Sequence, residues 1–478
     1  MIQTFIYTSK NSNSYIYDDQ HRLSLLIHPE LEKAFDKMND TNPYYLKKYT
    51  YLKDHGFFSE PKFANFKTAV NESMVIESII QTHQIVFETT DFCNLNCLYC
   101  SFGELYQGYD MRNFKNINTQ NAVTLLKYIF ELNPKNKNRN LSIAFYGGEP
   151  LLNINFIKEI VDVVNQLNAE KEINISYLMT TNATLLHKHI DYLVANKFRV
   201  LVSLDGNKEN HSYRIFKKND ENSFHQVIEN IDMIQRDYSD YFNSYVNFNA
   251  VLHNRNSVKE IYDFIYTRYH KIPRIAELSS DDINPNKKVL LDRMLHRKSE
   301  SEAEYQKDKS NLLNHVDLLS FKELTDFLKY YSINFYVSNV LSLLKNEEKN
   351  LPTNTCFPFS KKIYLTNRNK LLPCERINYK YSMGEVNHNV IIDIPKITQQ
   401  LNFYYEQLKN VCQSCYTYKF CGLCMFQVDN LDKLDTEKFI CDRFHNLKAF
   451  KNKLNRIFSF LENYPNDFSQ IIENVVIT

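Results

Sequence analysis

Short apolar runs alternate with segments of helical spacing through the middle of the chain. The apolar, β-branched runs predict strands, and apolar residues at helical intervals between them predict helices. The expected strands lie at residues 84–90, 141–146, 175–179, 198–204, 245–252 and 274–278, and the expected helices at 122–132, 156–167, 185–194, 224–238 and 258–269. Strands that alternate with helices favour a parallel sheet, so we expect an α/β fold, a partial (β/α)6 TIM-like barrel.

The two ends of the chain carry different patterns. Near the N-terminus, apolar runs at 5–8, 14–17 and 23–27 predict three strands, and helical segments follow near 31–38 and 45–55, ended by Gly56. Residues 281–345 are polar and rich in Lys, Glu and Leu, which predicts linking helices. Apolar residues at helical intervals over 444–461 predict a terminal helix that stops before Pro465.

These patterns divide the chain into five parts. An N-terminal α+β domain covers 1–80, a barrel core 81–285, a helical linker 286–345, a cysteine-rich domain 346–443 and a C-terminal helix 444–478. The cysteines mark the same division, because three lie in the expected barrel and seven in the cysteine-rich domain. At about 150 residues per domain, a chain of 478 residues is long enough for several hydrophobic cores.

The composition limits the classes of binding partner and the cellular compartment that we expect for this protein. Lys and Arg number 57 against 56 Asp and Glu, so bulk charge gives no reason to expect a nucleic-acid or membrane partner. No window approaches the roughly 18 uncharged apolar residues of a membrane span, and the N-terminus lacks a signal pattern, so we expect a cytoplasmic protein. In a reducing compartment, clustered cysteines bind metal or act in catalysis more often than they form disulfides.

The first three cysteines form a compact motif, Cys93-X3-Cys97-X2-Cys100, directly after the first barrel strand. Three thiolates on one tight loop can hold three irons of a 4Fe-4S cluster and leave the fourth iron open. The alternatives are three buried thiols or part of a zinc site, which needs a fourth ligand from elsewhere.

Three further motifs follow expected strands: Tyr146-Gly147-Gly148-Glu149-Pro150, Thr180-Thr181-Asn182 and Ser203-Leu204-Asp205-Gly206. Together with the cysteine loop they resemble the radical SAM enzymes, which use a 4Fe-4S cluster and S-adenosyl-L-methionine (SAM). The resemblance implies that Tyr99 lies against the adenine and that the methionine amino group is met by Gly147, Gly148, Glu149 and Pro150. It further implies contacts to the methionine and ribose from Thr181, Asn182, Ser203 and Asp205, with the carboxylate held by Ser203 and Arg214.

The second cysteine group begins with Cys356-X12-Asn369-X4-Cys374, continues with Cys412-X2-Cys415-X5-Cys421-X2-Cys424 and ends at Cys441. This spacing resembles the SPASM region of radical SAM peptide-modifying enzymes. It departs from that pattern twice, because Asn369 replaces a glycine and the last pair is CX2C instead of CX3C. The resemblance implies one auxiliary 4Fe-4S cluster on Cys412, Cys415, Cys421 and Cys441. It implies a second cluster on Cys356, Cys374 and Cys424, which is one cysteine short. A pair of zinc sites is the alternative, since CX2C pairs are common zinc ligands.

The resemblance implies reductive cleavage of SAM to a 5′-deoxyadenosyl radical that abstracts a substrate hydrogen. All ten thiols are assigned to clusters, so none is left to return a hydrogen atom, and a net two-electron oxidation fits best. Glu375, directly after Cys374, occupies the place where sulfatase-maturing enzymes carry a carboxylate base. The alternative is an exposed turn glutamate.

The three strands and two helices of residues 1–80 resemble the recognition element of maturases of ribosomally made peptides (RiPPs), in which a leader peptide adds as an extra strand. An N-terminal cap or dimer contact is the alternative.

Our leading prediction is therefore a peptide maturase, an oxidoreductase that forms a thioether or carbon–carbon crosslink in a precursor peptide, with flavodoxin or ferredoxin as reductant. An anaerobic sulfatase-maturing enzyme that oxidises Cys or Ser to formylglycine comes second, disfavoured by the N-terminal region, and a non-enzymatic iron-sulfur or zinc protein third.

Overall fold

A computed structural model describes residues 1–36, 41–58, 60–66, 69–133, 136–306, 319–332, 351–428, 431, 439, 441 and 443–474. The chain forms two compact units. The first consists of Met1–Ala69, Gln306–Thr355 and Asn402–Thr478, and the second of Val70–Tyr305 and Cys356–Leu401. The first unit therefore contains both the N-terminal strands and the C-terminal helices, and the five-part division expected from the sequence stays a prediction. Residues 307–318 and 333–345 of the expected linker lie outside the described residues.

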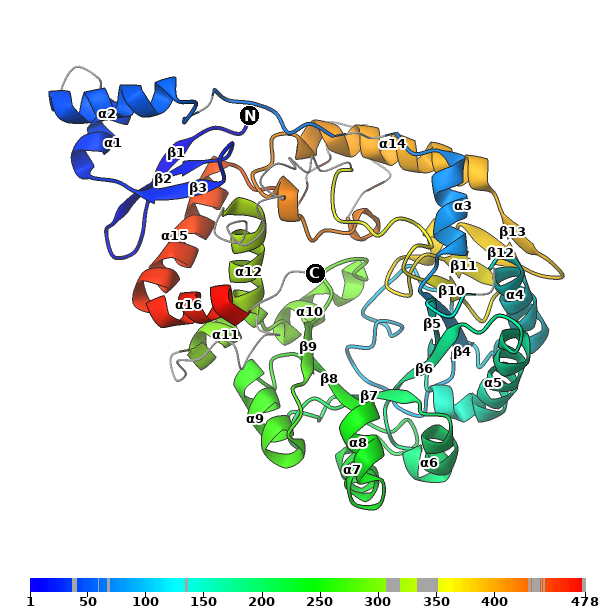
Figure 1. Ribbon diagram of the computed structural model, residues 1–478. Helices are drawn as coiled ribbons and strands as arrows, with labels where there is room; N and C mark the ends of the chain where they lie inside the picture. The colour runs from blue at the N-terminus through cyan, green and yellow to red at the C-terminus, as the bar shows by residue number, and fades with distance from the viewer. Residues whose placement is uncertain are drawn as a thin grey trace. The chain divides into compact units, whose positions relative to one another are not determined.

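The second unit is built on a parallel sheet in which neighbouring strands follow chain order (Figure 1). Its six strands are β4 (Gln84–Thr90), β5 (Asn140–Gly147), β6 (Asn174–Thr181), β7 (Arg199–Ser203), β8 (Val246–Leu252) and β9 (Arg274–Glu277). The helices between them are α4 (Thr119–Leu132), α5 (Ile154–Asn168), α6 (Leu186–Ala195), α7 (Phe224–Asp237), α8 (Ser239–Tyr245) and α9 (Val258–Tyr269). The predicted partial α/β barrel is confirmed. The short helix α8 is the one element of this series that the apolar pattern does not predict.

Four strands from the cysteine-rich region extend the same sheet. They are β10 (Ile363–Leu365), which pairs in parallel with β4, and the antiparallel strands β11 (Lys370–Leu372), β12 (Gly384–Val386) and β13 (Val390–Ile392). Asn369 lies in the turn between β10 and β11 with a φ of 69°, a left-handed conformation that asparagine adopts more readily than most residues. This conformation explains why asparagine can replace the glycine of the SPASM pattern at this position.

Alternation along the barrel strands separates a helix-packed face from a cavity-lining face. Phe87 and Phe145 are buried with Phe156 of α5, their ring centroids 5.8 and 6.3 Å from that ring. The residues before them, Val86 and Ala144, line a cavity of the second unit, to whose wall Phe145 also contributes. Since successive side chains of a strand point to opposite faces, the apolar runs of the sequence serve both the outer core and the cavity wall.

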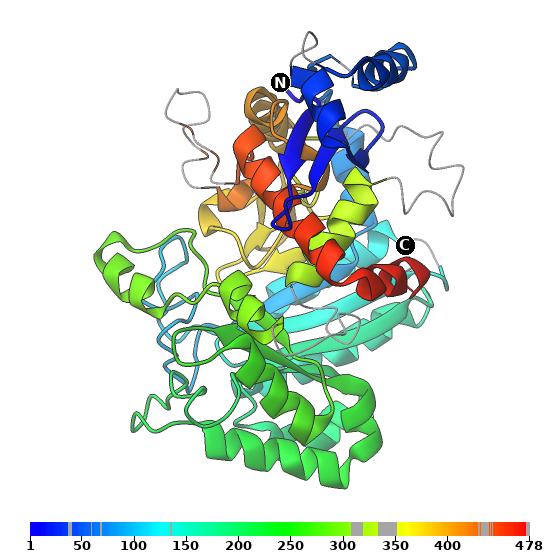
Figure 2. The ribbon, with the colours of Figure 1, turned by 90° about the vertical axis from the view of Figure 1, so that its left-hand side faces the viewer.

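The first unit holds an antiparallel sheet of β1 (Phe5–Thr8), β2 (Ser14–Asp18) and β3 (Leu23–Leu26), followed by α1 (Pro29–Asp36) and α2 (Pro43–Asp54). All five elements were predicted within about two residues where described; positions 37 and 38 of the first helix lie outside the described residues. The terminal helix is α15 (Leu447–Asn463), which packs against the sheet through Phe450 and Phe458 (Figure 2). A further helix, α16 (Pro465–Asn474), begins at the proline.

The other α-helices of the described residues are α3 (Glu72–Ile80), α10 (Lys288–Met294), α11 (Lys298–Gln306), α12 (Leu319–Tyr331) and α14 (Ile394–Cys412). In the described part of the chain, none of the helices is long and apolar enough to cross a membrane.

Candidate active site

The cysteine loop leaves the carboxyl end of β4 and turns tightly. The amide of Cys100 donates to the carbonyl of Cys97 at 3.1 Å, and the amide of Gly103 donates to the carbonyl of Cys100 at 2.7 Å. The sulfur of Cys93 accepts hydrogen bonds from the amide of Leu95 at 3.5 Å and from the side chain of Asn182 at 3.7 Å. Burial raises the pKa of the Cys93 thiol to about 11 and also raises the pKa of Cys97. The loop thus presents soft thiol donors that need a bound cation to become thiolates, which fits an iron-sulfur cluster.

The glycines of the Tyr146–Pro150 motif bring this segment directly against the start of the cysteine loop. The amide of Gly148 donates to the carbonyl of Thr90 at 2.8 Å, and the amide of Glu149 donates to the carbonyl of Phe92 at 2.9 Å. A β-carbon on Gly148 would lie 1.9 Å from the carbonyl oxygen of Phe92. The sequence predicts glycines here for approach to a ligand, and the structure shows that they also allow approach to the protein's own backbone.

Glu149 joins the ends of two strands to this loop. Its fully buried carboxylate accepts from the amide of Leu151 at 3.1 Å, the hydroxyl of Thr181 at 2.7 Å and the amide of Asn182 at 2.8 Å. The side chain of Asn182 donates in turn to the amide oxygen of Asn94 at 2.9 Å. Burial raises the pKa of Glu149 to about 7 despite these donors. Three of the predicted SAM-contacting residues therefore lie together, and Pro150, directly after Glu149, is the buried first residue of a short 3-10 helix.

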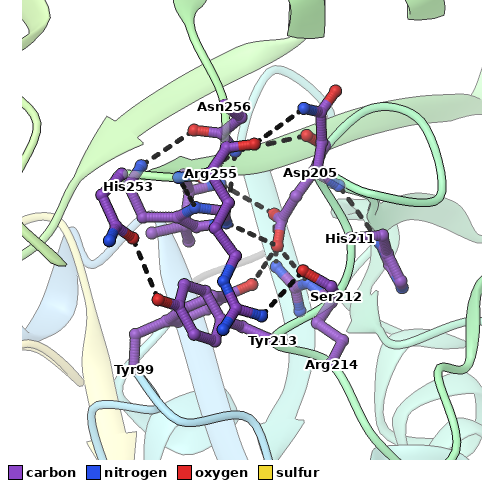
Figure 3. Close-up of polar contacts among 12 residues, drawn as sticks. Tyr99, Asp205, His211, Ser212, Tyr213, Arg214, His253, Arg255 and Asn256 are labelled. Atoms are coloured by element: carbon purple, nitrogen blue, oxygen red, sulfur yellow. Dashed lines mark hydrogen bonds and ion pairs between the residues drawn. The ribbon is translucent and has the colours of Figure 1, made fainter.

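A second carboxylate, Asp205, organises the other side of the loop (Figure 3). It is fully buried and accepts from Nε and Nη2 of Arg214 at 2.9 and 3.0 Å, from the amide of Val251 at 2.9 Å and from the hydroxyl of Tyr99. Burial opposes ionisation of Asp205, but the Arg214 guanidinium outweighs it and holds the pKa of Asp205 well below its usual range. The ring of Tyr99 stacks on His253 with centroids 5.5 Å apart.

This network gives Arg214 a partner that the sequence does not predict. Its guanidinium is paired with Asp205, whereas Ser203 lies at the end of β7, two residues before that carboxylate. Holding the SAM carboxylate would require Arg214 to share or release this ion pair, so the role stays a prediction. The sequence reasoning missed His253 and Asn256, although the polar run His253-Asn254-Arg255-Asn256 after β8 is the kind of strand-end segment that marks the other site residues.

In the first unit, four cysteines line one pocket. They are the four predicted to share an auxiliary cluster, Cys412, Cys415, Cys421 and Cys441. The sulfur of Cys415 also accepts a hydrogen bond from the amide of His445 at 3.4 Å. The other set is divided between the units, with Cys356 and Cys374 in the second and Cys424 in the first. Among the described residues, no three His, Cys, Asp or Glu side chains are close enough to chelate a single metal ion.

Glu375 faces a cavity of about 610 Å³ within the barrel. The carboxylate is bound by Nζ of Lys362 at 2.7 and 3.0 Å, and its side chain is 12% exposed. Burial alone would favour the neutral acid, but Lys362 and Arg376 outweigh it and keep the pKa of Glu375 below its usual value. Tyr146 and Thr180 line the same cavity. Glu375 is therefore a cavity residue and not an exposed turn glutamate.

The close backbone approach at Gly148 makes a specific prediction. Gly148→Ala should lower the free energy of unfolding by at least about 2 kcal/mol, because its β-carbon collides with the Phe92 carbonyl, and should reduce the iron retained after reconstitution. Gly422→Ala is the matched control, since a β-carbon there meets nothing within 4 Å. Urea unfolding and iron analysis measure both effects, and equal values for the two variants would contradict the steric argument.

The buried ion pair makes a second prediction. Asp205→Asn leaves the guanidinium of Arg214 buried without a counter-charge and should lower the free energy of unfolding by about 3–5 kcal/mol at neutral pH. Because the folded state lowers the pKa of Asp205, this contribution is lost as the pH falls below the usual carboxyl range, so wild type and variant should converge in acid. Asp237→Asn, which breaks an exposed pair with Arg236, should leave stability unchanged. A difference between wild type and Asp205→Asn that does not depend on pH would refute the assignment.

Comparison with known proteins agrees with this geometry. A family model described as the radical SAM superfamily matches residues 87–265. The cysteine-type anaerobic sulfatase-maturating enzyme of Clostridium novyi is 25% identical over 370 residues, which cover 76% of this chain and 92% of the relative. The radical SAM cyclopropyl synthase TigE of Paramaledivibacter caminithermalis is 27% identical over 249 residues, which cover 50% of this chain and 46% of TigE.

A solved structure of native anSMEcpe with bound AdoMet and Cp18Cys peptide shares the fold, with a TM-score of 0.53 and 16% identity over 82% of this chain and all of that chain. At this identity the likeness shows a shared fold, and this chain in addition has a cysteine-rich C-terminal region. Cys93, Glu149 and Asp205 all lie inside the matched segment, and the chain therefore contains a radical SAM domain over residues 87–265.

Proposed function

We propose that the protein is a peptide maturase that oxidatively modifies a ribosomally made precursor, forming a thioether or carbon–carbon crosslink. The observation that carries the proposal is the barrel cavity of about 610 Å³, which has Glu375 in its wall and Tyr146, two residues before Gly148, in the same lining. A cavity of this size accommodates a few residues of an extended peptide. The printed names of two relatives, a sulfatase-maturating enzyme and an enzyme with a bound peptide, support a peptide or protein substrate.

In this proposal, a 4Fe-4S cluster is held by Cys93, Cys97 and Cys100, and SAM by Tyr99, Glu149, Thr181, Asn182 and Ser203. When bound, the cluster and SAM supply the 5′-deoxyadenosyl radical that removes a hydrogen atom from the substrate. The chain positions these groups by buried hydrogen bonds: Glu149 fixes the end of β6, and Asp205 fixes the ring of Tyr99. Such buried contacts limit motion at the reacting centre.

Glu375 is assigned the removal of the substrate proton that accompanies oxidation. Lys362 and Arg376 keep its carboxylate ionised at neutral pH, so it can accept a proton without first losing one. One auxiliary 4Fe-4S cluster would be held by Cys412, Cys415, Cys421 and Cys441, and a second by Cys356, Cys374 and Cys424. Such clusters would supply an acceptor for the second electron. A flavodoxin or ferredoxin would supply the reducing electron.

The second candidate is an anaerobic sulfatase-maturing enzyme, which oxidises a Cys or Ser to formylglycine. It is favoured by the likeness to the Clostridium novyi enzyme over 92% of that protein. Both candidates need the same cluster loop and a base at Glu375, and they differ in the product.

The N-terminal sheet supports a leader-binding role. The amide of Ile27 donates to the carbonyl of Ser14, and β2 and β3 pair in register, so the backbone groups of Ser24 and Leu26 point away from β2. Among the described residues, no strand pairs with this outer edge of β3, and Leu26 is 65% exposed. An unpaired edge of this kind can accept an added peptide strand.

Cleavage of SAM tests the proposed function directly. The reconstituted, dithionite-reduced protein should convert SAM to 5′-deoxyadenosine and methionine, and Cys93→Ala should abolish this product because the loop loses one of three ligands. Met111→Ala, at a position that is 85% exposed, is the control and should keep it. Liquid chromatography measures 5′-deoxyadenosine and methionine, and the absence of SAM cleavage would refute both candidate functions.

Mass spectrometry of a co-expressed precursor distinguishes the two candidates. Loss of hydrogens in pairs without a new aldehyde supports crosslinking, and a new aldehyde supports the sulfatase-maturing enzyme.

The leader-binding role is tested at the edge of the sheet. Ser24→Pro removes an outward amide without touching the β2–β3 hydrogen bonds, so it should weaken binding of the precursor at least about fivefold while leaving SAM cleavage intact. Ser24→Ala keeps the amide and should bind as the wild type does. Fluorescence anisotropy with a labelled precursor gives both affinities, and equal affinities for the two variants would exclude β3 as the docking strand.

A further inference from the structure

The cavity of the second unit concentrates positive charge. Its charged lining consists of one carboxylate, Glu375, and four cations, Arg199, Arg274, Lys362 and Arg376. The chain as a whole is nearly neutral, with 57 basic and 56 acidic residues, so this excess is a local feature of the barrel. A concave surface lined by one sign of charge attracts ligands of the opposite sign.

Two of these cations have no counter-charge. Glu375 is bound by Lys362 at 2.7 Å and faces Arg376 at 4.0 Å, so one carboxylate already serves two cations. The side chains of Arg199 and Arg274 form no ion pair or hydrogen bond with any described residue, and both residues are exposed. Unpaired guanidinium groups in a cavity are ready to bind an anion, because arginine offers two parallel donors to a carboxylate.

The positions of the two arginines identify one end of the barrel. Arg199 is the first residue of β7 and Arg274 the first residue of β9, with β8 between them (Figure 1). In a parallel sheet these amino ends lie opposite the carboxyl ends, where the cysteine loop leaves β4. Leu201 and Ala276, two residues further along each strand, line the same cavity, so the arginines share its wall. The side-chain amides of Asn247 and Asn249 on β8 lie in the wall between them.

We propose that the amino-end mouth of this cavity binds a carboxylate of the substrate peptide through Arg199 and Arg274, while Asn247 and Asn249 bind its backbone. The inference rests on the proposed function, because it assigns a chemical class to the peptide that enters the cavity. An acidic peptide is drawn to the mouth by charge, and its carboxylate anchors there while the residue to be modified extends toward Tyr146 and the cysteine loop. The carboxylate belongs either to an Asp or Glu side chain or to the peptide's C-terminus.

Binding of synthetic peptides to the full, reconstituted protein tests the inference without turnover. The probes are short fluorescent peptides with one central Cys, flanked by Glu or by Gln, each made with a free or an amidated C-terminus. We expect a free carboxylate to improve affinity about tenfold at low salt, and less at high salt, where surface charges are screened. Preference for Glu over Gln in the amidated pair indicates a side-chain anchor, and preference for the free terminus in the Gln pair indicates a terminal one.

Variants connect the preference to the two arginines. Arg199→Gln combined with Arg274→Gln should reduce the tenfold preference to less than about twofold, because amides cannot replace the charge. Arg236→Gln, on the exposed end of α7, is the matched control and should retain the preference. Equal binding of the acidic and neutral peptides to the wild type overturns the inference by itself, even if the double variant fails to fold, and so does a preference that survives in a folded double variant.

The outcome is distinguishable from that of the proposed function. If SAM is cleaved but peptide binding ignores charge, the function stands and the carboxylate anchor fails. If acidic peptides bind through the arginines but SAM is not cleaved, the anchor stands and the maturase proposal fails.

Discussion

The buried carboxylate of Asp205 is the contact on which the site depends most. It joins three pieces of chain that meet at the carboxyl end of the sheet: Tyr99 of the cysteine loop, Arg214 beyond β7 and the backbone of Val251 in β8. Burying a charge costs free energy unless the charge is paired and fully hydrogen-bonded. In this site each hydrogen bond to Asp205 also positions a segment of the chain. The barrel therefore fixes the position of the cysteine loop, through contacts with residues that lie far from the CX3CX2C motif in the sequence.

Glu149 has the equivalent role on the neighbouring strands, with a different electrostatic result. Its donors are two backbone amides and a hydroxyl, with no cation among them, so burial prevails and its pKa is raised, whereas Arg214 lowers the pKa of Asp205. Glu149 can therefore change its protonation near neutral pH, whereas Asp205 stays ionised there. A cationic ligand group beside Glu149 would favour its ionised form, which agrees with the proposed contact between Glu149 and the amino group of SAM.

The two ends of the barrel carry side chains of different chemical character. The carboxyl ends of the strands gather the soft thiols and the buried carboxylates, whereas the amino ends of β7 and β9 carry exposed, unpaired arginines. Glu375 enters the same cavity from the cysteine-rich region, because β10 extends the sheet beside β4. The wall of the cavity is thus formed by two stretches of sequence almost 300 residues apart, so the cysteine-rich region contributes directly to the cavity in which substrate is proposed to bind.

The sequence by itself determined the six barrel strands, the N-terminal sheet and the grouping of Cys93, Cys97 and Cys100, because these follow from local periodicity and from spacing within one loop. It also placed Glu149, Thr181 and Asn182 at strand ends, which a parallel sheet brings to one edge. Only the tertiary structure decided the pairing of Arg214 with Asp205, the stacking of His253 on Tyr99 and the salt bridge from Lys362 to Glu375. These contacts depend on which strands become neighbours and which face a side chain takes. Strands β10 and β11 have only three residues each, too few to show an apolar periodicity in the sequence. Long-range packing therefore determines which strands they pair with.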